Sequence, residues 1–423
     1  MTQTLILSPG SWPSSVSVED TFMQPEVDGA LKVFDRVIVA PQMIGGELAR
    51  APRGIEIDVS LAERLARRTR VQTVRAALEG PLPLNELFRR PQVLRHKKAM
   101  VEFVAHAARA SIARHWLDDS LSAMRLDPAH VTVSTFWWTP ATTGFALLRR
   151  TRPGLKVFTR AHGFDLYEDR HDPAYIPARE TGLRWLCRVF PDSAAGTSYL
   201  QKAVPWAAQV VETARLGVDD PRVIAKPSTD GVLRVVTCCM LRPIKRIGLL
   251  VEGLAAAAKL APAQRIEWTH HGTGPLQAEL EARAKELPTT ITSRFAGYSS
   301  QAALFEAYAK SPVDVVVNTS VSEGTSVALM EAIACGIPLL VTAVGGNVEI
   351  GGPENSVHLS ANPSPEEIGR ALLQFRPEAS GALARRTASR ALWERDYDSR
   401  RNSFEHFRTL RAWPTPPSMM KPA

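Results

Sequence analysis

Short apolar runs rich in branched side chains alternate along the chain with longer stretches whose apolar positions recur every three or four residues. The first pattern predicts buried strands and the second predicts amphipathic helices. Their alternation is typical of parallel sheets joined by crossover helices. In the first half the predicted strands are residues 5–8, 36–40, 131–136, 156–160, Val189 with its neighbours and 210–214, and the predicted helices are 60–78 and 97–124.

The second half repeats this alternation. Strands are predicted at residues 233–239, 265–270, 293–296, 315–318 and 339–342, and helices are predicted to begin at Gly248, Leu276, Gln301, Ser326 and Pro365. Between the halves, residues 217–231 are polar, carry two prolines and begin and end with glycine, which indicates a linker. The chain is therefore predicted to form two Rossmann-like α/β domains that face each other across a cleft, where open parallel sheets bind their ligands.

Length and composition agree with this organisation. A chain of 423 residues exceeds the size at which one core keeps growing. No apolar run approaches the ~18 residues of a membrane-spanning helix and no basic leader precedes the first strand, so we expect a cytoplasmic protein. The cysteines 187, 238, 239 and 335 lie in apolar segments without a CxxC pair. This favours buried reduced thiols, with a thiolate nucleophile as the minor alternative.

The net charge of +8 and the pI near 9.5 favour an anionic partner, namely nucleic acid, a nucleotide diphosphate or an anionic membrane face. No zinc-finger spacing or basic stripe with interleaved aromatics accompanies the charge, so we expect no nucleic acid. One dense basic segment, RRPQVLRHKK at residues 89–98, leaves two interpretations open: docking on an anionic membrane surface, or a solvated helix face.

Residues 315–350 place two carboxylates eight positions apart, Glu323 in a loop after a strand and Glu331 in the following helix. The backbone amides of Gly324, Thr325 and Ser326 near the helix start are groups that bind anions such as a diphosphate. A carboxylate separation of roughly 10 Å suits the two diols of a nucleotide sugar. From spacing alone, two unrelated solvated glutamates remain the alternative.

The segment EGTSVALMEAIACGIPLLVTAVGGNVEI resembles the signature of two glutamates separated by seven residues in the retaining GT-B glycosyltransferases of family 4, group 1. TRAHGFDLYEDRHDPAYIPAR, VVTCCMLRPIKRIGLLVEGL and HHGTGPLQAELE resemble further segments of bacterial exopolysaccharide members, in the same order. The resemblance implies a GT-B fold. An acceptor-binding domain would span 1–216 and be completed by a helix at about 395–412, a nucleotide-sugar domain would span 217–394, and 413–423 would form a tail.

The resemblance also implies roles for single residues. Glu331 would bind the donor ribose, Glu323 the transferred sugar, and Lys245 the diphosphate leaving group. His162, which follows a predicted strand, would support the reacting centre. Met240 stands where many family members have arginine, and Arg242, on the same side of an extended strand, is the expected substitute.

Three glycines complete the predicted site. Gly10 would lie close to phosphate or acceptor, and Gly272 and Gly274 would line the nucleobase side. The only Asp-x-Asp string, residues 396–398, lies in a helical pattern in which positions i and i+2 point to different faces. We therefore expect no bound metal and no cofactor besides the substrate.

These observations predict a retaining, metal-independent enzyme that moves a hexosyl unit from a UDP- or GDP-sugar to a glycan or a polyprenyl-diphosphate-linked glycan in surface or exopolysaccharide synthesis. It would act in the cytoplasm, either free or peripheral on the inner face of the cell membrane. A nucleotide-sugar 2-epimerase of the same fold and a catalytically silent sugar-nucleotide-binding protein are the two alternatives. Met240 is the feature that favours the silent protein.

Overall fold

The computed structural model of the chain describes residues 2–15, 17, 19–48, 52–67, 86, 90–377, 379 and 381–414. The chain forms two compact units: a first unit of Met1–Leu216 with Ser399–Ala423, and a second unit of Gly217–Asp398. The first unit thus ends where the sequence places the linker. Residues 68–78 of the predicted helix 60–78, Arg89 of the basic segment and residues 415–423 of the predicted tail lie outside the described residues.

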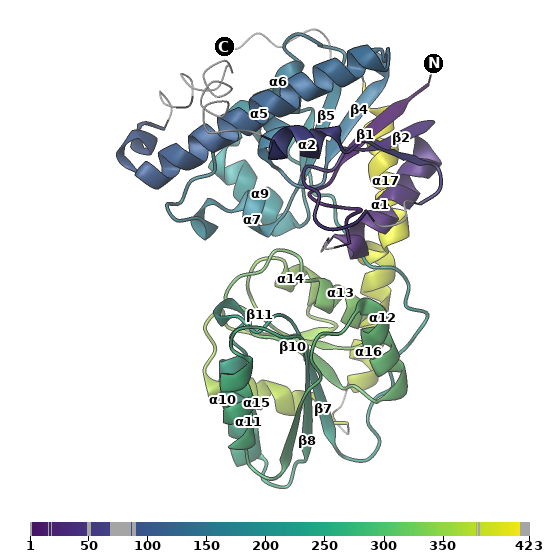
Figure 1. Cartoon of the computed structure of the whole chain (residues 1–423). Coiled ribbons are helices and arrows are strands. Elements are labelled where there is room, and N and C mark those ends of the chain that lie inside the picture. Colours follow the sequence, from purple (N-terminus) through teal and green to yellow (C-terminus); the bar gives the residue numbers. More distant parts are fainter. Residues whose placement is uncertain are drawn as a thin grey trace. The chain divides into compact units, whose positions relative to one another are not determined.

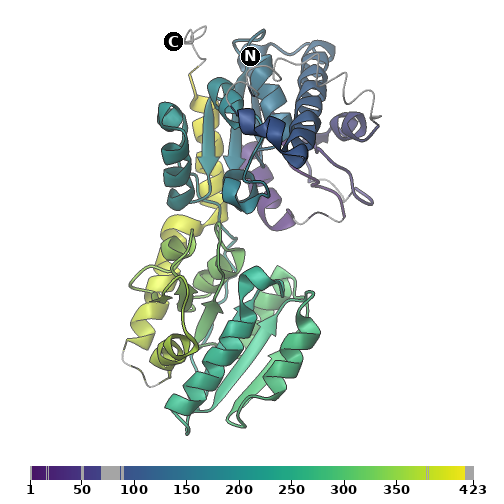
Figure 2. The same cartoon turned by 90° about the vertical axis from the view of Figure 1, so that its left-hand side faces the viewer.

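The first unit is built on a six-stranded parallel sheet with the order β3-β2-β1-β4-β5-β6. Its strands are β1 (Thr4–Ser8), β2 (Arg36–Val39), β3 (Ile55–Ile57), β4 (Val131–Thr135), β5 (Lys156–Ala161) and β6 (Arg188–Pro191). Its helices are α1 (Asp20–Val33), α2 (Ser60–Ala66), α5 (Lys97–Ala123), α6 (Pro140–Leu148), α7 (Gly163–Leu166), α8 (Arg179–Trp185), α9 (Ala194–Ala203) and α17 (Ser399–Ala412). Every residue of β1, β4 and β5 is buried, because helices cover both faces of the sheet (Figures 1 and 2).

Helix α17 returns to the first unit and packs along α1 (Figure 1). The contact is close because Gly29 has no side chain, and a Cβ there would lie 2.9 Å from Ser403. Beneath it, the buried Arg160 guanidinium pairs with Glu26 at 2.7 Å, and the hydroxyl of Ser403 donates to the same carboxylate. Strand β5, helix α1 and the end of the chain are thereby joined in one core.

The second unit has the same architecture, with the order β12-β11-β10-β7-β8-β9. Its strands are β7 (Leu233–Cys238), β8 (Ile266–His271), β9 (Ile291–Phe295), β10 (Val315–Asn318), β11 (Leu339–Thr342) and β12 (Ser356–Leu359). Its helices are α10 (Ile247–Leu260), α11 (Gln277–Lys285), α12 (Gln301–Lys310), α13 (Val327–Ala334), α14 (Asn347–Ile350), α15 (Pro365–Leu372) and α16 (Ala382–Leu392). In both units the strand order reverses between the first and fourth strands, the point where ligands bind in such sheets.

Short helical turns connect these elements. They are η1 (Pro91–Arg95), η2 (Pro128–His130), η3 (Glu168–Arg170), η4 (Pro205–Val210), η5 (Pro243–Lys245) and η6 (Leu373–Phe375), and one π-helical turn, η7 (Trp393–Tyr397). Local sequence explains several element boundaries. For α15, Pro365 occupies the first turn and the Ser364 hydroxyl accepts the amide of Glu367.

The structure differs from the sequence-based prediction at several elements. Residues 210–214 run beside β6, and the amides of Glu212 and Ala214 donate to the carbonyl oxygens of Val189 and Pro191, but the pairing amounts to one isolated bridge, between Val189 and Val211, rather than a strand. The short edge strands β3 and β12 and helix α16 escaped the pattern analysis because their polar positions interrupt the apolar runs. The predicted helix from about 395 is wrong at its start. Its π-helical turn ends at Tyr397, Asp398 bridges to Val218, and α17 begins at Ser399.

Two further properties concern the described part of the chain. Within it, no helix combines the length and the apolar character needed to cross a membrane.

All four cysteines are unpaired, and burial raises the pKa of each thiol above its ordinary value. The thiolate form is therefore disfavoured at neutral pH, which counts against a cysteine nucleophile.

Candidate functional site

Lys245 and Glu323 form an ion pair at the carboxyl ends of the neighbouring strands β7 and β10. Lys245 ends η5 and Glu323 lies in the loop after β10, with Nζ and Oε1 2.5 Å apart. The same Oε1 accepts from the Ser320 hydroxyl at 2.6 Å and from the Asn318 amide at 3.0 Å. Burial alone would raise the pKa of Glu323, but Lys245 and these two donors together hold it below its ordinary value. The carboxylate is therefore ionised at neutral pH.

Two glycines allow this loop to close. Gly345 has φ +50, and a Cβ there would lie 2.0 Å from the carbonyl oxygen of Glu323. The amide of Gly346 donates to the carbonyl oxygen of Gly324 at 3.1 Å. A side chain at position 345 would push the loop away from the strand ends, so the Gly345-Gly346 pair has a direct physical reason at this site.

Glu331, on α13, is 6 % exposed and accepts a hydrogen bond of 2.9 Å from the amide of Gln301, the first residue of α12. Burial raises its pKa to about 7. The helix begins at Val327 with Ser326 as its N-cap, so Gly324 and Thr325 lie in the loop that precedes it. Only Ser326 of these three stands at the helix end.

The loop after β8 packs against the loop after β7. A Cβ on Gly272, whose φ is +134, would lie 1.9 Å from the carbonyl oxygen of Cys239, and a Cβ on Gly274 would lie 2.5 Å from that of Leu241. The amide of Gly272 also donates to the carbonyl oxygen of Gly297 at 2.7 Å. Residues 297–301 thus touch the Gly272 loop at one end and, through Gln301, Glu331 at the other.

Arg242 and Met240 do not occupy the positions that the sequence predicted for them. Strand β7 ends at Cys238, so the strand alternation that was expected to place Arg242 on the side of Met240 does not apply. Both side chains are exposed, Met240 by 51 %. Among the described residues, none forms a hydrogen bond or ion pair with the Arg242 guanidinium. Lys245, by contrast, is fixed in the ion pair described above.

His162 and Gly10 lie in the first unit. The His162 ring is 7 % exposed and packs against Phe136 and Trp137, with ring centroids 4.8 and 4.5 Å away. Within the described part of the unit neither ring nitrogen has a hydrogen-bond partner. The nearest carboxylate oxygen, on Asp165, is 3.9 Å from Nδ1. Both nitrogens are buried, so a contact with a bound molecule would require this side chain to move.

The loop at Gly10 holds a carboxylate of the protein itself. Glu19, 3 % exposed, accepts the amides of Gly10, Ser11 and Trp12 at 2.9, 2.7 and 2.9 Å, and also the indole N–H of Trp137. The sequence predicted that this loop passes close to phosphate or acceptor. In the structure these three amides are already satisfied by Glu19, which the pattern analysis missed because it lies nine positions further along the chain.

Residues 241–388, which include Lys245, Glu323 and Glu331, match the family model described as "Glycosyl transferases group 1". The matched segment lies within the second unit. No curated protein sequence matches the chain.

Solved structures extend the comparison to both units. The lipopolysaccharide outer core galactosyltransferase WaaB is 14 % identical, with a TM-score of 0.66 over 96 % of this chain and 98 % of that chain. HepE of Anabaena, solved with UDP and glucose, is 15 % identical, with a TM-score of 0.60 over 98 % and 100 %. An α,α-trehalose-phosphate synthase from Burkholderia vietnamiensis is 12 % identical, with a TM-score of 0.69 over 98 % and 99 %. These likenesses show the GT-B fold of two Rossmann-like units.

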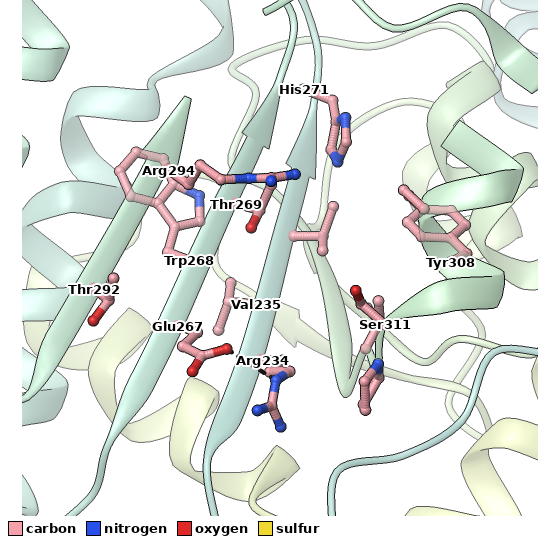
Figure 3. Close-up of a pocket in the computed structure, with 14 residues that line it drawn as sticks. Arg234, Val235, Glu267, Trp268, Thr269, His271, Thr292, Arg294, Tyr308 and Ser311 are labelled. Atoms are coloured by element: carbon pink, nitrogen blue, oxygen red, sulfur yellow. Dashed lines mark hydrogen bonds and ion pairs between the residues drawn. The ribbon is translucent and has the colours of Figure 1, made fainter. Parts of the chain in front are cut away.

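The second unit also carries a pocket of about 400 Å³ between α12 and one face of β7, β8 and β9 (Figure 3). Arg234 in this pocket is already paired with Asp230 and Glu267, at 2.7 and 2.9 Å. None of the site residues predicted from the sequence lines it. The pocket is therefore separate from the arrangement around Lys245 and Glu323.

Proposed function

We propose that the chain is a retaining, metal-independent glycosyltransferase that moves a hexosyl unit from a nucleotide diphosphate sugar to a glycan or a lipid-linked glycan in surface or exopolysaccharide synthesis. The observation that carries this proposal is the Lys245–Glu323 pair at the strand-order reversal of the second unit, with the buried carboxylate of Glu331 on the next helix. The match of residues 241–388 to the family model also supports glycosyl transfer.

Each group in this arrangement has a chemical task in our proposal. The hydrogen bonds that described residues make to Glu323 all go to Oε1, which leaves Oε2 for hydroxyl groups of the transferred sugar. The ammonium of Lys245 shares its charge with the departing diphosphate, and stabilisation of that developing charge is the main catalytic effect. Glu331 accepts hydrogen bonds from the ribose diol of the donor.

In this proposal the leaving phosphate oxygen takes the acceptor proton, so that no separate base is needed for transfer with retention. We assign acceptor binding to the first unit. The unpartnered ring nitrogens of His162 support that assignment, since a shift of this side chain would let either one hydrogen-bond an acceptor hydroxyl. Lys245 and main-chain amides take the place of a divalent cation at the diphosphate.

Donor choice is tested by thermal unfolding with UDP, GDP and their glucose, galactose, mannose and N-acetylglucosamine conjugates. A donor that binds only the native state raises the melting temperature. HepE of Anabaena, solved with UDP and glucose, makes UDP the first nucleotide to try. Stabilisation by neither nucleotide, at concentrations up to several millimolar, would refute the proposal.

Product analysis then separates the activities. Mass spectrometry of a reaction with a stabilising donor and a glycan acceptor library, in EDTA, is expected to show a hexose added to the acceptor. NMR of the new anomeric proton is expected to show the donor's configuration. A donor converted to its 2-epimer without acceptor would instead identify an epimerase, and binding without any turnover would identify a silent sugar-nucleotide-binding protein.

We further propose that the basic segment docks the enzyme on an anionic membrane that presents a polyprenyl-diphosphate-linked acceptor. From Leu94 to Lys98 five consecutive side chains are exposed, and Leu94, at 61 % exposure, adds an apolar group to the cations. Co-sedimentation with vesicles containing phosphatidylglycerol is expected for the wild-type chain and not for the variant Arg95→Glu/Lys97→Glu/Lys98→Glu. Equal binding of both proteins would exclude this segment as the docking site.

A further inference from the structure

Arg246 is the single residue between η5 and α10, and its backbone is left-handed, with φ +50 and ψ 37. A side chain other than glycine is rarely found in this conformation unless its surroundings hold it there. The guanidinium of Arg246 donates four hydrogen bonds: to the carbonyl oxygens of Thr319, Ser320 and Ala361 at 2.7, 3.0 and 2.8 Å, and to Asn362 Oδ1 at 3.1 Å. One side chain thus fastens the loops after β10 and β12 to the end of η5.

Residues of the loop after β10 also donate hydrogen bonds of their own, to the Lys245 backbone and to the Glu323 side chain. The hydroxyl of Thr319 donates to the carbonyl oxygen of Lys245 at 3.0 Å. Ser320, whose carbonyl oxygen accepts from Arg246, donates its own hydroxyl to the Glu323 carboxylate at 2.6 Å. The backbone beside Lys245 and the loop beside Glu323 are therefore held to each other from both sides.

We propose that Arg246 is a positioning residue, which fixes the Lys245 ammonium where a nucleotide diphosphate binds. This inference rests on the proposed function. A lysine ammonium sits on a flexible four-carbon stem, so its location depends on the backbone that carries the side chain and on the carboxylate with which the ammonium pairs. Arg246 fixes the backbone of Lys245, because it is the next residue in the chain, and it fixes the Glu323 carboxylate, because its guanidinium anchors the loop that carries Glu323. Displacement of a group by about 1 Å is enough to cost on the order of 10²-fold in rate.

The chain offers a matched control. Arg222 is also a left-handed arginine, with φ +54, but its side chain is exposed and it lies in the linker. Replacement of either arginine by glycine relieves the same backbone constraint. Only Arg246→Gly removes the hydrogen bonds to the loops after β10 and β12. A difference between the two variants therefore reports on the guanidinium contacts.

Calorimetric titration with UDP and with uridine tests the inference, since only UDP carries the phosphates that Lys245 would contact. We expect Arg246→Gly to lower UDP affinity about tenfold and uridine affinity less than twofold, a loss of one charge-assisted contact. Arg222→Gly should bind both as the wild type does. Millimolar guanidinium chloride, but not sodium chloride, should restore part of the UDP affinity of Arg246→Gly.

A double-variant cycle separates positioning from a general structural role. If Arg246 acts through Lys245, Arg246→Gly produces no further loss of UDP affinity in the Lys245→Ala background. An equal loss in both backgrounds, an equal loss for UDP and uridine, or no loss at all would overturn the inference while leaving the proposed function intact. If the wild-type protein binds neither UDP nor GDP, the proposed function fails and the inference with it.

Discussion

The two units have the same strand order, yet the position where that order reverses is filled differently in each. In the first unit, the amides of the loop after β1 enclose the carboxylate of Glu19, a residue of the same chain. In the second, the loops after β7 and β10 bring together Lys245 and Glu323, and within the described residues the hydrogen bonds to Glu323 all go to one of its two oxygens. The topology makes a crevice at the strand ends in both units, and the side chains decide whether the protein itself occupies it.

The two sites also differ in how their contacts contribute to stability. Glu19 satisfies three backbone amides and an indole, which is a closed set of contacts that stabilises the loop. The Lys245–Glu323 pair is compact, and the loops that carry it are fixed by the close approach of Gly345 and by the hydrogen bonds of Arg246. We therefore expect the first site to govern stability and the second to govern nucleotide binding and turnover. Each prediction below tests that separation.

The largest effect is expected for Lys245→Ala. Loss of the cation beside the leaving diphosphate should lower turnover by about 10²-fold or more. Because Glu323 would then keep only Ser320 and Asn318 as partners in a buried site, the free energy of unfolding should also fall, by about 2 kcal/mol. Steady-state kinetics and urea unfolding measure the two losses. The double variant Lys245→Met/Glu323→Gln should regain stability without regaining activity. Full turnover in Lys245→Ala would remove the lysine from the mechanism.

Glu19→Ala should destabilise the protein by about 3 kcal/mol, since it leaves one buried and two partly buried amides without an acceptor. Urea unfolding measures this loss, and Glu63→Ala, at an exposed ion pair, should cost less than about 0.5 kcal/mol. The affinity of Glu19→Ala for UDP should equal that of the wild type. A selective loss of UDP affinity instead would show that the Gly10 loop takes part in donor binding, and the contrast between the units would break down.

Glu331 should make stability and nucleoside binding respond to pH in opposite directions. Its pKa of about 7 in the folded chain exceeds the 4.5 of an unperturbed side chain, so the folded state retains a proton that the unfolded state loses between these values. The free energy of unfolding should therefore fall by about 3 kcal/mol as pH rises from 4.5 to 7. Urea titrations of the wild type and Glu331→Gln, whose amide does not titrate, isolate this contribution.

Uridine affinity, by contrast, should rise about tenfold between pH 6 and pH 8, because the ribose diol donates to the ionised form of Glu331. Calorimetry at both pH values measures the change. Glu331→Gln should bind uridine weakly and without this pH dependence. A flat profile in the wild type would mean that Glu331 does not contact the ribose.

Arg242→Ala should have the smallest effect, a decrease of about threefold in UDP affinity. Water and salt screen the charge of an exposed cation, so its attraction to the diphosphate is weak. Calorimetric titration with UDP at low and high salt measures it. A loss as large as that of Lys245→Ala would show that Arg242 replaces the arginine expected at Met240, and the second unit would then hold its diphosphate with two cations.

Most of the fold was predictable from local sequence. The Val triplet of β10 and the β-branched and aromatic residues of β4 and β5 identify strands, and these are buried because helices cover both faces of such a sheet. The edge strands β3 and β12 carry exposed polar positions, so the same reasoning misses them. Glu323 and Lys245 were found through family resemblance. Their 2.5 Å contact joins residues 78 positions apart, and no periodicity within either segment reports it.

The sequence by itself determined the alternation of strands and helices, the division near Gly217 and the residue types available for chemistry, because each of these depends on local pattern. Only the tertiary structure decided which charges meet. Glu19 lies in the amides of the Gly10 loop, Arg246 holds the loop after β10, and Gln301 binds Glu331. Pairing over such sequence separations depends on how the sheet and its loops pack, and that packing is a property of the folded unit rather than of any one segment.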